Sequence, residues 1–401
     1  MPSALPLWSS GFRPFFLVGV AYGAALMLAW AFALASPDAA SWPSFATRSW
    51  HAHEMMFGFA VSIIAGVVLT ALPSWAGTDE VRGARLLQLT ALWCAGRAAV
   101  WIAWTSSYAW LVVVDLLFVP ALFATVLPHL LRATNRRYLF LPLVLAGIYA
   151  AQLASHYGAA PASAGALRGA VYAIVVLYVL VGGLFTPVFT GNVLRAKGRG
   201  DQAPFVPALE AASVVLVVVL AALDLAAAPD AWIGVAALAC TLVHGVRVIR
   251  WKGWRAAEEP IVLSMNLGFA WLVAAFALRT IAAFGNSVPA DAWVHAFTVG
   301  SLGLMMLGLM TRVVLRHTGR PLDMPPSIVA AGAALLVAAL LRLAASVHGL
   351  GNAPVALAAL LFAGGFSAWL ARFAPMLLAP SLPRKTAPAS SPSRASRSAR
   401  G

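Results

Sequence analysis

The sequence predicts an all-α, polytopic integral membrane protein with about twelve transmembrane helices. Two features of the composition lead to this fold class. Hydrophobic residues make up 62% of the 401 residues and charged residues only 10%, whereas roughly a quarter of a typical soluble chain is charged. The mean hydropathy is +0.86. The third observation is the pattern, because apolar runs of spanning length recur along the whole chain.

The apolar runs are each about 20 residues long, which suffices to cross a hydrocarbon core of ~30 Å. Proline, glycine and clusters of charge mark their ends. In chain order, the expected helices cover residues 14–36, 51–74, 86–104, 108–131, 137–156, 168–190, 205–227, 231–249, 261–284, 292–315, 326–348 and 354–379. We expect residues 1–379 to form a single transmembrane domain, and residues 380–401, rich in Ser, Pro, Ala and Arg, to form a disordered cytoplasmic tail.

The first run, from Pro14 to Leu34, resembles a signal peptide because Ala33-Leu34-Ala35 has the form of a cleavage site. The run is longer than a typical h-region and long enough to span. We therefore expect it to be a retained transmembrane helix.

Basic residues alternate between the two sides of the predicted bundle. Loops that follow odd-numbered helices hold only two of them, Arg48 and Arg168. The loops after even-numbered helices and the C-terminal tail hold most of the others, among them Arg82, Arg85, Arg132, Arg136, Arg137, Arg195, Lys197, Arg199, Arg250, Lys252, Arg255, Arg316, Arg320, Arg384 and Lys385. By the positive-inside rule, both termini are cytoplasmic. The net charge of +14 then follows from topology, and no nucleic-acid partner is expected.

The eight histidines fall near both membrane faces in this topology. His51, His53, His156, His295 and His348 lie near the outer face, and His129, His244 and His317 near the inner face. Ionisable groups at membrane depth are costly and usually face a cavity, a partner or a cofactor. The two cysteines, Cys94 and Cys240, form no paired framework and give no redox compartment.

The second helix opens with the densest group of such residues, Trp50-His-Ala-His-Glu-Met55. At 100° per residue, His51 and Glu54 share a face while His53 points nearly opposite. A regular helix therefore cannot place both histidines on one metal ion. One histidine would bind the metal, and the other would bind a second cofactor or form a hydrogen bond to a metal ligand. The motif is not a zincin, because Phe57 stands where the second histidine is needed. The alternative is a structural role in the interfacial belt.

The tenth and eighth helices carry further candidate ligands. His295 and Met306 lie on nearly one face of the tenth helix, and glycines between them allow close approach of a helix or a flat macrocycle. Arg312, with His317 after it, forms a cationic inner rim suited to propionates, phosphates or lipid headgroups; helix packing and topology are the alternative explanation. In the eighth helix, His244 follows Cys240 by four residues, a spacing that suits copper, although a buried cysteine is usually a small hydrophobe.

Three arginines lie inside apolar runs and need anionic partners. They are Arg97, Arg279 and Arg342. The acids available at similar depth are Glu54, Asp115 and Asp224. An anionic cofactor is the other partner that would serve.

Several motifs together resemble the NnrS family: Gly11-Phe-Arg13-Pro-Phe-Phe16, Trp50-His-Ala-His-Glu-Met55, His295-Ala-Phe-Thr-Val-Gly300, Met310-Thr-Arg312 and His317-Thr-Gly-Arg320-Pro321. They span nearly the whole chain in order. The resemblance implies a multi-pass protein of the bacterial inner membrane that contains haem, of b-type, and copper, and that serves the response to nitric oxide, or nitrosative stress. It implies a nitric oxide or other diatomic ligand, and a lipid environment.

The resemblance also implies which residues form the sites. Cofactor-binding candidates are His51, His53, His295, Arg312 and His317, and metal candidates are His51, His53, Glu54, His244 and His295. One position departs from the expected pattern: Asn266 stands in the ninth helix where we expect a histidine. An amide is a poor haem or copper ligand, so either the position is no ligand or this member lacks one site.

Two other functions remain open at this stage, and so does enzymatic activity. A secondary transporter would use a six-plus-six arrangement, with broken helices around Gly182-Gly183 and Thr186-Pro187. No convincing internal repeat supports it. A quinol-linked electron carrier would need two cofactors within tunnelling reach and a membrane-borne electron donor.

Overall fold

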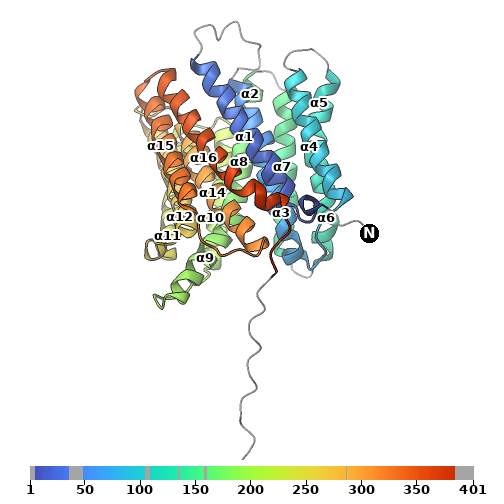
Figure 1. The fold of residues 1–401 in the computed structure, drawn as a ribbon. Coiled ribbons are helices and arrows are strands. Elements are labelled where there is room, and N and C mark those ends of the chain that lie inside the picture. The colour runs from blue at the N-terminus through green and yellow to red at the C-terminus, as the bar shows by residue number, and fades with distance from the viewer. Residues whose placement is uncertain are drawn as a thin grey trace, which may run out of the picture.

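The computed structural model describes residues 5–35, 48–103, 109–133, 136–157, 160–285 and 287–383. The regular elements of these residues are all helices, and the long ones run side by side as a bundle (Figure 1). The start of α1 and the end of α16 lie at the same end of the bundle (Figure 1). An even number of crossings, as the sequence predicts, produces this arrangement.

The long helices are α1 (Phe12–Ala35), α3 (Val61–Ala76), α4 (Ala84–Ala103), α6 (Phe118–Arg132), α7 (Phe140–Tyr157), α8 (Ala160–Leu177), α9 (Gly183–Ala196), α10 (Pro207–Leu225), α11 (Asp230–Trp251), α12 (Pro260–Phe284), α14 (Gly303–His317), α15 (Pro326–His348) and α16 (Asn352–Leu378). The short elements are η1 (Pro6–Trp8), α2 (Arg48–His53), α5 (Ala109–Leu116), η5 (Arg136–Leu139), η7 (Gly253–Ala256) and α13 (Ala292–His295). Three π-helical segments are η4 (Glu54–Ala60), η6 (Tyr178–Gly182) and η8 (Ala296–Leu302).

Within the described residues, 11 helical stretches are long and apolar enough to cross a membrane. They confirm the predicted class of all-α, multi-pass membrane protein, and their bounds agree closely with the predicted ones. The remaining predicted span, 86–104, corresponds to helix α4, which is not among the 11. Its apolar run carries the polar side chains Gln88 and Arg97. The cytoplasmic placement of the termini stays a prediction.

The helix predicted over 168–190 is not interrupted around Gly182 and Pro187, where a transporter would have a break. The helical stretch Ser163–Ala196 is continuous, with the π segment η6 in its middle and Pro187 inside α9. A π segment absorbs an inserted residue by shifting backbone hydrogen bonds to i→i+5 without ending the helix. This removes one of the observations that would favour a transporter with discontinuous helices.

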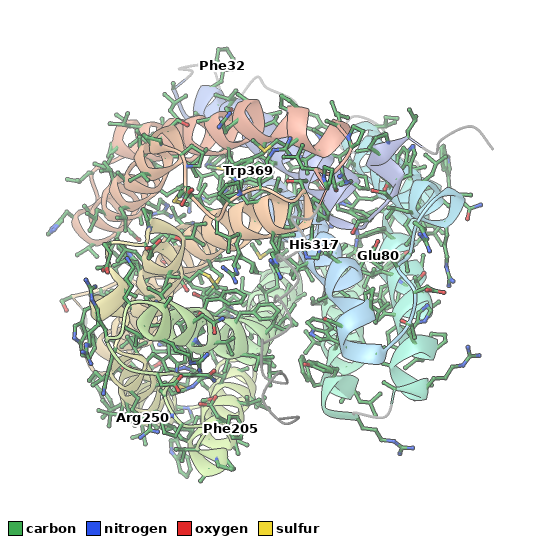
Figure 2. All side chains as sticks on the ribbon, turned by 60° about the horizontal axis from the view of Figure 1, so that its bottom comes forward. Phe32, Glu80, Phe205, Arg250, His317 and Trp369 are labelled. Carbon is green, nitrogen blue, oxygen red and sulfur yellow. The ribbon has the colours of Figure 1, made fainter. Side chains whose placement is uncertain are left out.

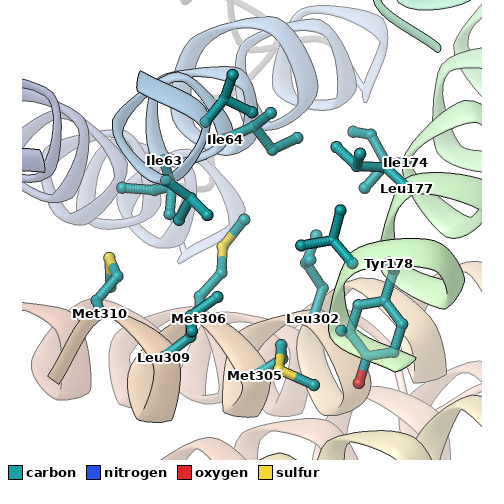
Figure 3. A pocket seen from close by; sticks show the side chains of 14 residues that line it. Ile63, Ile64, Ile174, Leu177, Tyr178, Leu302, Met305, Met306, Leu309 and Met310 are labelled. Carbon is teal, nitrogen blue, oxygen red and sulfur yellow. The ribbon is translucent and has the colours of Figure 1, made fainter. Parts of the chain in front are cut away.

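The three helices that contain π segments converge on one apolar cavity (Figure 3). Each helix contributes several aliphatic or thioether side chains to its wall. The lining residues are Ile63, Ile64, Val67, Val68, Ile174, Leu177, Tyr178, Val181, Gly182, Leu302, Met305, Met306, Leu309 and Met310. Residues of η6 and η8 line the cavity directly, and η4 and η8 follow directly after the candidate histidines His53 and His295.

Helix α1 packs between α3 and α16 and connects the start of the chain to its last helix. Phe16 contacts Trp369 edge to face, with ring centroids 6.2 Å apart. A Cβ at Gly66 would lie 2.7 Å from the Phe16 ring, so glycine permits α3 to approach α1 this closely. The Trp369 indole in turn donates a hydrogen bond to Thr311 Oγ1 at 3.1 Å.

Arg13, from the first of the recognised motifs, closes the same end of the bundle. Its buried guanidinium donates to the carbonyl oxygens of Leu377 and Ala379, each at 2.7 Å, and to Ser381 Oγ at 2.9 Å. Ser381 Oγ donates to the His317 carbonyl at 3.0 Å. Figure 2 shows His317 near the middle of the view, with Arg250 and Phe205 at its lower edge. Arg13 thus satisfies carbonyls that the end of α16 would leave unpaired.

Replacing Arg13 with methionine is expected to lower the free energy of unfolding by about 1.5–3 kcal/mol, because buried carbonyls lose charged hydrogen-bond donors. Thermal unfolding in detergent, followed by circular dichroism, measures this change. Arg372→Met is the matched control, since Arg372 is exposed on the same helix α16. Equal stability of the two variants would contradict a capping role for Arg13.

Candidate metal centre

Two histidines and an aspartate from three helices bring their ligand atoms together inside the bundle. The atoms are His53 Nε2, Asp115 Oδ2 and His156 Nε2, contributed by α2, α5 and α7. The two histidine nitrogens lie 3.2 Å apart, and the aspartate oxygen lies 3.3 Å from His53 and 2.7 Å from His156. Donors that share one metal at bonds of roughly 2.1 Å lie about 3–3.4 Å apart. Two of the three distances fall in this range, and the third, 2.7 Å between His156 and Asp115, is that of a hydrogen bond. The three atoms are close enough to bind one metal ion after a small adjustment.

Glu54 and Arg97 contact the atoms of His53 and Asp115 that point away from the cluster, and so hold both side chains in place. Glu54 Oε1 lies 2.8 Å from His53 Nδ1 and accepts a hydrogen bond from Arg97 at 2.7 Å. Arg97 also donates to Asp115 Oδ1, and Gln152 donates to Asp115 Oδ2 at 3.0 Å. A carboxylate that accepts the Nδ1 proton fixes the ring orientation and leaves Nε2 with its lone pair for a metal. With that tautomer, His53 Nε2 and Asp115 Oδ2 are two acceptors 3.3 Å apart, and either a cation or the Nε2 proton of His156 can bridge them.

The net formal charge of the cluster also favours the binding of a cation. Glu54 and Asp115 are fully buried, and Arg97 is 5% exposed. Two carboxylates and one guanidinium give −2 + 1 = −1 when both histidines are neutral. An uncompensated buried charge costs several kcal/mol. A bound cation, or a proton on a histidine, removes this excess.

The second carboxylate oxygen of Glu54, Oε2, also accepts a hydrogen bond. Tyr22 donates its hydroxyl proton to Glu54 Oε2, and the Trp101 indole donates to the Tyr22 hydroxyl at 2.9 Å. Glu54 thus receives hydrogen bonds from three side chains and lies behind His53 instead of among the converging atoms. The predicted role of Glu54 as a metal ligand stays a prediction, and the geometry favours a supporting role.

His51 and His295 form a second group, separate from the metal cluster. The His51 ring stacks on Trp30, with centroids 4.5 Å apart and an interplanar angle of 14°. His295 is the last residue of α13, and the charge of His51 acts on it. The side chains of His51 and His53 therefore point to different places in the bundle, as the helical spacing predicts.

The other predicted site residues lie apart from these two groups. His244 Nε2 lies 3.2 Å from the Ser213 carbonyl, and its Nδ1 lies 3.2 Å from Arg247. Both ring nitrogens of His244 are therefore engaged by protein atoms. Arg247 in turn pairs with Glu210 at 2.6 Å. Buried Cys240 lies one turn before His244 on the same helix.

The predicted inner rim is at the opposite end of the bundle from the metal cluster. The Arg312 guanidinium lies 3.7 Å from the centroid of Phe189, and the exposed His317 contacts the ring of Phe12. At the position of the expected histidine, the Asn266 amide donates to Thr190 Oγ1 at 3.0 Å and to the Val262 carbonyl at 2.9 Å. Asn266 thus takes part in packing helix α12 against α9.

Sequence reasoning did not assign His156 and Asp115 to a site. His156 was recognised only as an outer-face histidine, and Asp115 only as an acid that could pair with a buried arginine. Both lie far along the chain from His53, on α7 and α5, so no local spacing joins them. A signal was present, since Asp115 is the lone acid of its apolar run.

The fold and this cluster define a polytopic, all-helical membrane protein with a buried histidine–carboxylate group suited to a metal ion. The family described as NnrS protein matches residues 6–381. The chain therefore belongs to the NnrS family. A search of proteins with curated descriptions finds no match.

Proposed function

We propose that this chain is a membrane protein of the nitric oxide response, resident in the bacterial inner membrane, that binds copper and haem. Membership of the NnrS family suggests the role in the response. The convergence of His53 Nε2, Asp115 Oδ2 and His156 Nε2 is the observation that supports a metal centre most strongly. Of the two cofactors, this donor set suits copper.

The donor set fits copper on chemical grounds. Imidazole nitrogen is a ligand for copper, zinc, iron and nickel, and two imidazoles with one carboxylate leave coordination positions open. The formal charge of −1 around the cluster matches a monovalent cation and partly offsets a divalent one. Copper bound there would supply an open position for a diatomic ligand such as nitric oxide.

The surrounding residues orient the donors. Glu54 holds the His53 ring in one tautomer, and Arg97 together with Gln152 fixes the Asp115 carboxylate so that Oδ2 faces the histidines. Tyr22 and Trp101 complete the hydrogen bonds of Glu54, so the carboxylate has no need of water. A centre supported in this way keeps its geometry with or without a ligand in the open position.

Replacing His156 with alanine is expected to lower copper content at least tenfold while leaving the protein inserted and monodisperse. Copper per chain is measured by plasma mass spectrometry after purification in mild detergent, and nitrogen hyperfine splitting in the electron paramagnetic resonance spectrum counts the bound imidazoles. His129→Ala is the matched control, since His129 lies outside both histidine groups, at the opposite end of α6 from the cluster. Full copper occupancy in His156→Ala would refute this centre, and zinc or iron in place of copper would correct the metal.

A further inference from the structure

The apolar cavity lies where the middles of three membrane-spanning stretches meet (Figure 3). Ile63, Tyr178 and Met305, which all line it, lie near the midpoints of these three stretches. All of its lining residues are buried, and no lining side chain is more than 9% exposed. The cavity is therefore an internal space in the middle of the bundle, and not a groove on its lipid-facing surface.

The walls of the cavity are apolar. Isoleucine, valine, leucine and methionine side chains form most of them, and none of the described residues presents a polar atom to the space. Tyr178 contributes its ring, because its hydroxyl lies against Gly268 of α12, 2.8 Å from where a Cβ of that glycine would be. A buried water needs about two to four polar partners. Water and ions would lose their hydrogen bonds on entering, whereas an uncharged apolar molecule would not.

The volume of the cavity, about 70 Å³, limits what it can hold. In another protein, a cavity of about 150 Å³ lined by Leu, Ile and Phe binds benzene or xenon. A space about half as large is too small for a quinone ring, but it has room for a xenon atom or a molecule of two or three atoms. An acyl chain would have to pass between buried side chains to reach it. The size and the polarity of the cavity together select a dissolved gas.

The cavity coincides with two features that are uncommon in ordinary helix packing. Residues of the π segments η6 and η8 line it, and π segments frequently occur at functional sites. Met305, Met306 and Met310 also line it, and flexible thioether side chains normally fill irregular gaps in a core. Protein interiors contain few voids larger than a water molecule. A void that persists beside three such side chains indicates a space that the bundle maintains.

The cavity and the candidate metal centre share one helical stretch, Arg48–Ala76. His53 precedes Ile63 by ten residues, which is about 15 Å along a helix axis. Between them, Phe57 is 1% exposed, and the centroid of its ring lies 4.8 Å from that of the His53 ring. Phe57 and Ile63 belong to one contiguous apolar cluster. The side chains that separate the cavity from the centre therefore include an apolar layer that an uncharged molecule can cross more easily than an ion.

We propose that this cavity holds a small uncharged gas at the centre of the bundle, and that nitric oxide dissolved in the bilayer occupies it before it reaches the His53–Asp115–His156 centre. The identity of the gas rests on the proposed function, and the site rests on the cavity itself. Nitric oxide is uncharged and diatomic, so it meets the limits of size and polarity. Nitrite and nitrate carry a charge and are excluded from such a space.

Xenon, an uncharged atom of suitable size, tests the site without any cofactor. Crystals of the purified protein grown in a lipidic mesophase are pressurised with xenon, and anomalous diffraction locates the bound atoms. We expect one xenon atom in the cavity of the wild type, and an occupancy at least fivefold lower in Val67→Phe, because the added ring fills the space. Val218→Phe is the matched control, since Val218 is 50% exposed on α10.

A second variant keeps the xenon test independent of how well Val67→Phe folds. Ile64→Ala enlarges the cavity and is expected to raise the xenon occupancy at a pressure that does not saturate the wild type. Absence of xenon from both the wild type and Ile64→Ala would overturn the gas site. Ordered water or an acyl chain in the cavity would overturn it as well.

The association of nitric oxide with copper-loaded protein, followed by stopped-flow absorbance, tests the role of the cavity in the proposed function. Val67→Phe is expected to slow association at least threefold at unchanged copper content, whereas Val218→Phe is expected to match the wild type. An unchanged rate in Val67→Phe would overturn the passage of nitric oxide through the cavity. A wild-type protein that binds xenon in the cavity but no copper would overturn the proposed copper centre and support the gas site.

Discussion

Replacing Arg97 with methionine is expected to destabilise the folded protein by about 3–5 kcal/mol, the cost typical of removing one partner of a buried ion pair. The Arg97 guanidinium forms ion pairs with both Glu54 and Asp115. Both carboxylates are fully buried. Without the guanidinium the formal charge of the cluster changes from −1 to −2 on these two buried carboxylates. Reversible unfolding in mixed detergent micelles, followed by tryptophan fluorescence, measures the loss.

The double variant Arg97→Met with Asp115→Asn separates charge from packing. It restores the formal charge of −1 and is expected to regain a substantial part of the lost stability. Arg132→Met serves as the control, because Arg132 is exposed at the end of α6. A loss of less than about 1 kcal/mol in Arg97→Met, the range of an exposed ion pair, would show that water reaches the cluster.

The positions of the spanning helices could be predicted because the information that defines them is local. An apolar run and its flanking proline, glycine or charge lie together in the sequence, as in the predicted helix 326–348 and the observed α15. The π segments could not be predicted, because a one-residue shift of backbone hydrogen bonding leaves composition and length unchanged. The glycines at 182 and 183, which the alternative of a transporter would use as a break in the predicted helix 168–190, instead lie at a π segment within a continuous helix.

The candidate site was predicted where its residues are neighbours in the sequence and missed where they are not. His53 and Glu54 are adjacent, and the 100° step of a helix correctly separated His53 from His51. Asp115 and His156 reach the same point from other helices, and only the packing of α5 and α7 brings them there. The need of Arg97 and Arg279 for acids was predicted from burial, but the choice between Asp115 and Asp224 required the fold.

Replacing Glu54 with glutamine is expected to weaken metal binding at the His53–Asp115–His156 centre by about 10–100-fold, the range found when the partner of a metal-binding histidine is changed. The amide keeps the size of Glu54 and its contacts with Tyr22. It accepts the His53 Nδ1 proton less strongly, so the ring is held less firmly and donates less charge to a metal. The formal charge of the cluster also rises from −1 to 0, which removes the attraction for a cation.

Competition with a chromophoric chelator measures this affinity in the purified protein. Glu258→Gln is the matched control, because it makes the same chemical change at an exposed loop position that pairs with Lys197. Size-exclusion chromatography establishes that both variants remain folded. Since Glu54 lies behind His53, Glu54→Gln should leave the number of coordinated imidazole nitrogens unchanged while the affinity falls. An unchanged affinity, or a changed nitrogen count, would mean that Glu54 is not the residue that orients His53 and would place the carboxylate among the ligands or outside the centre altogether.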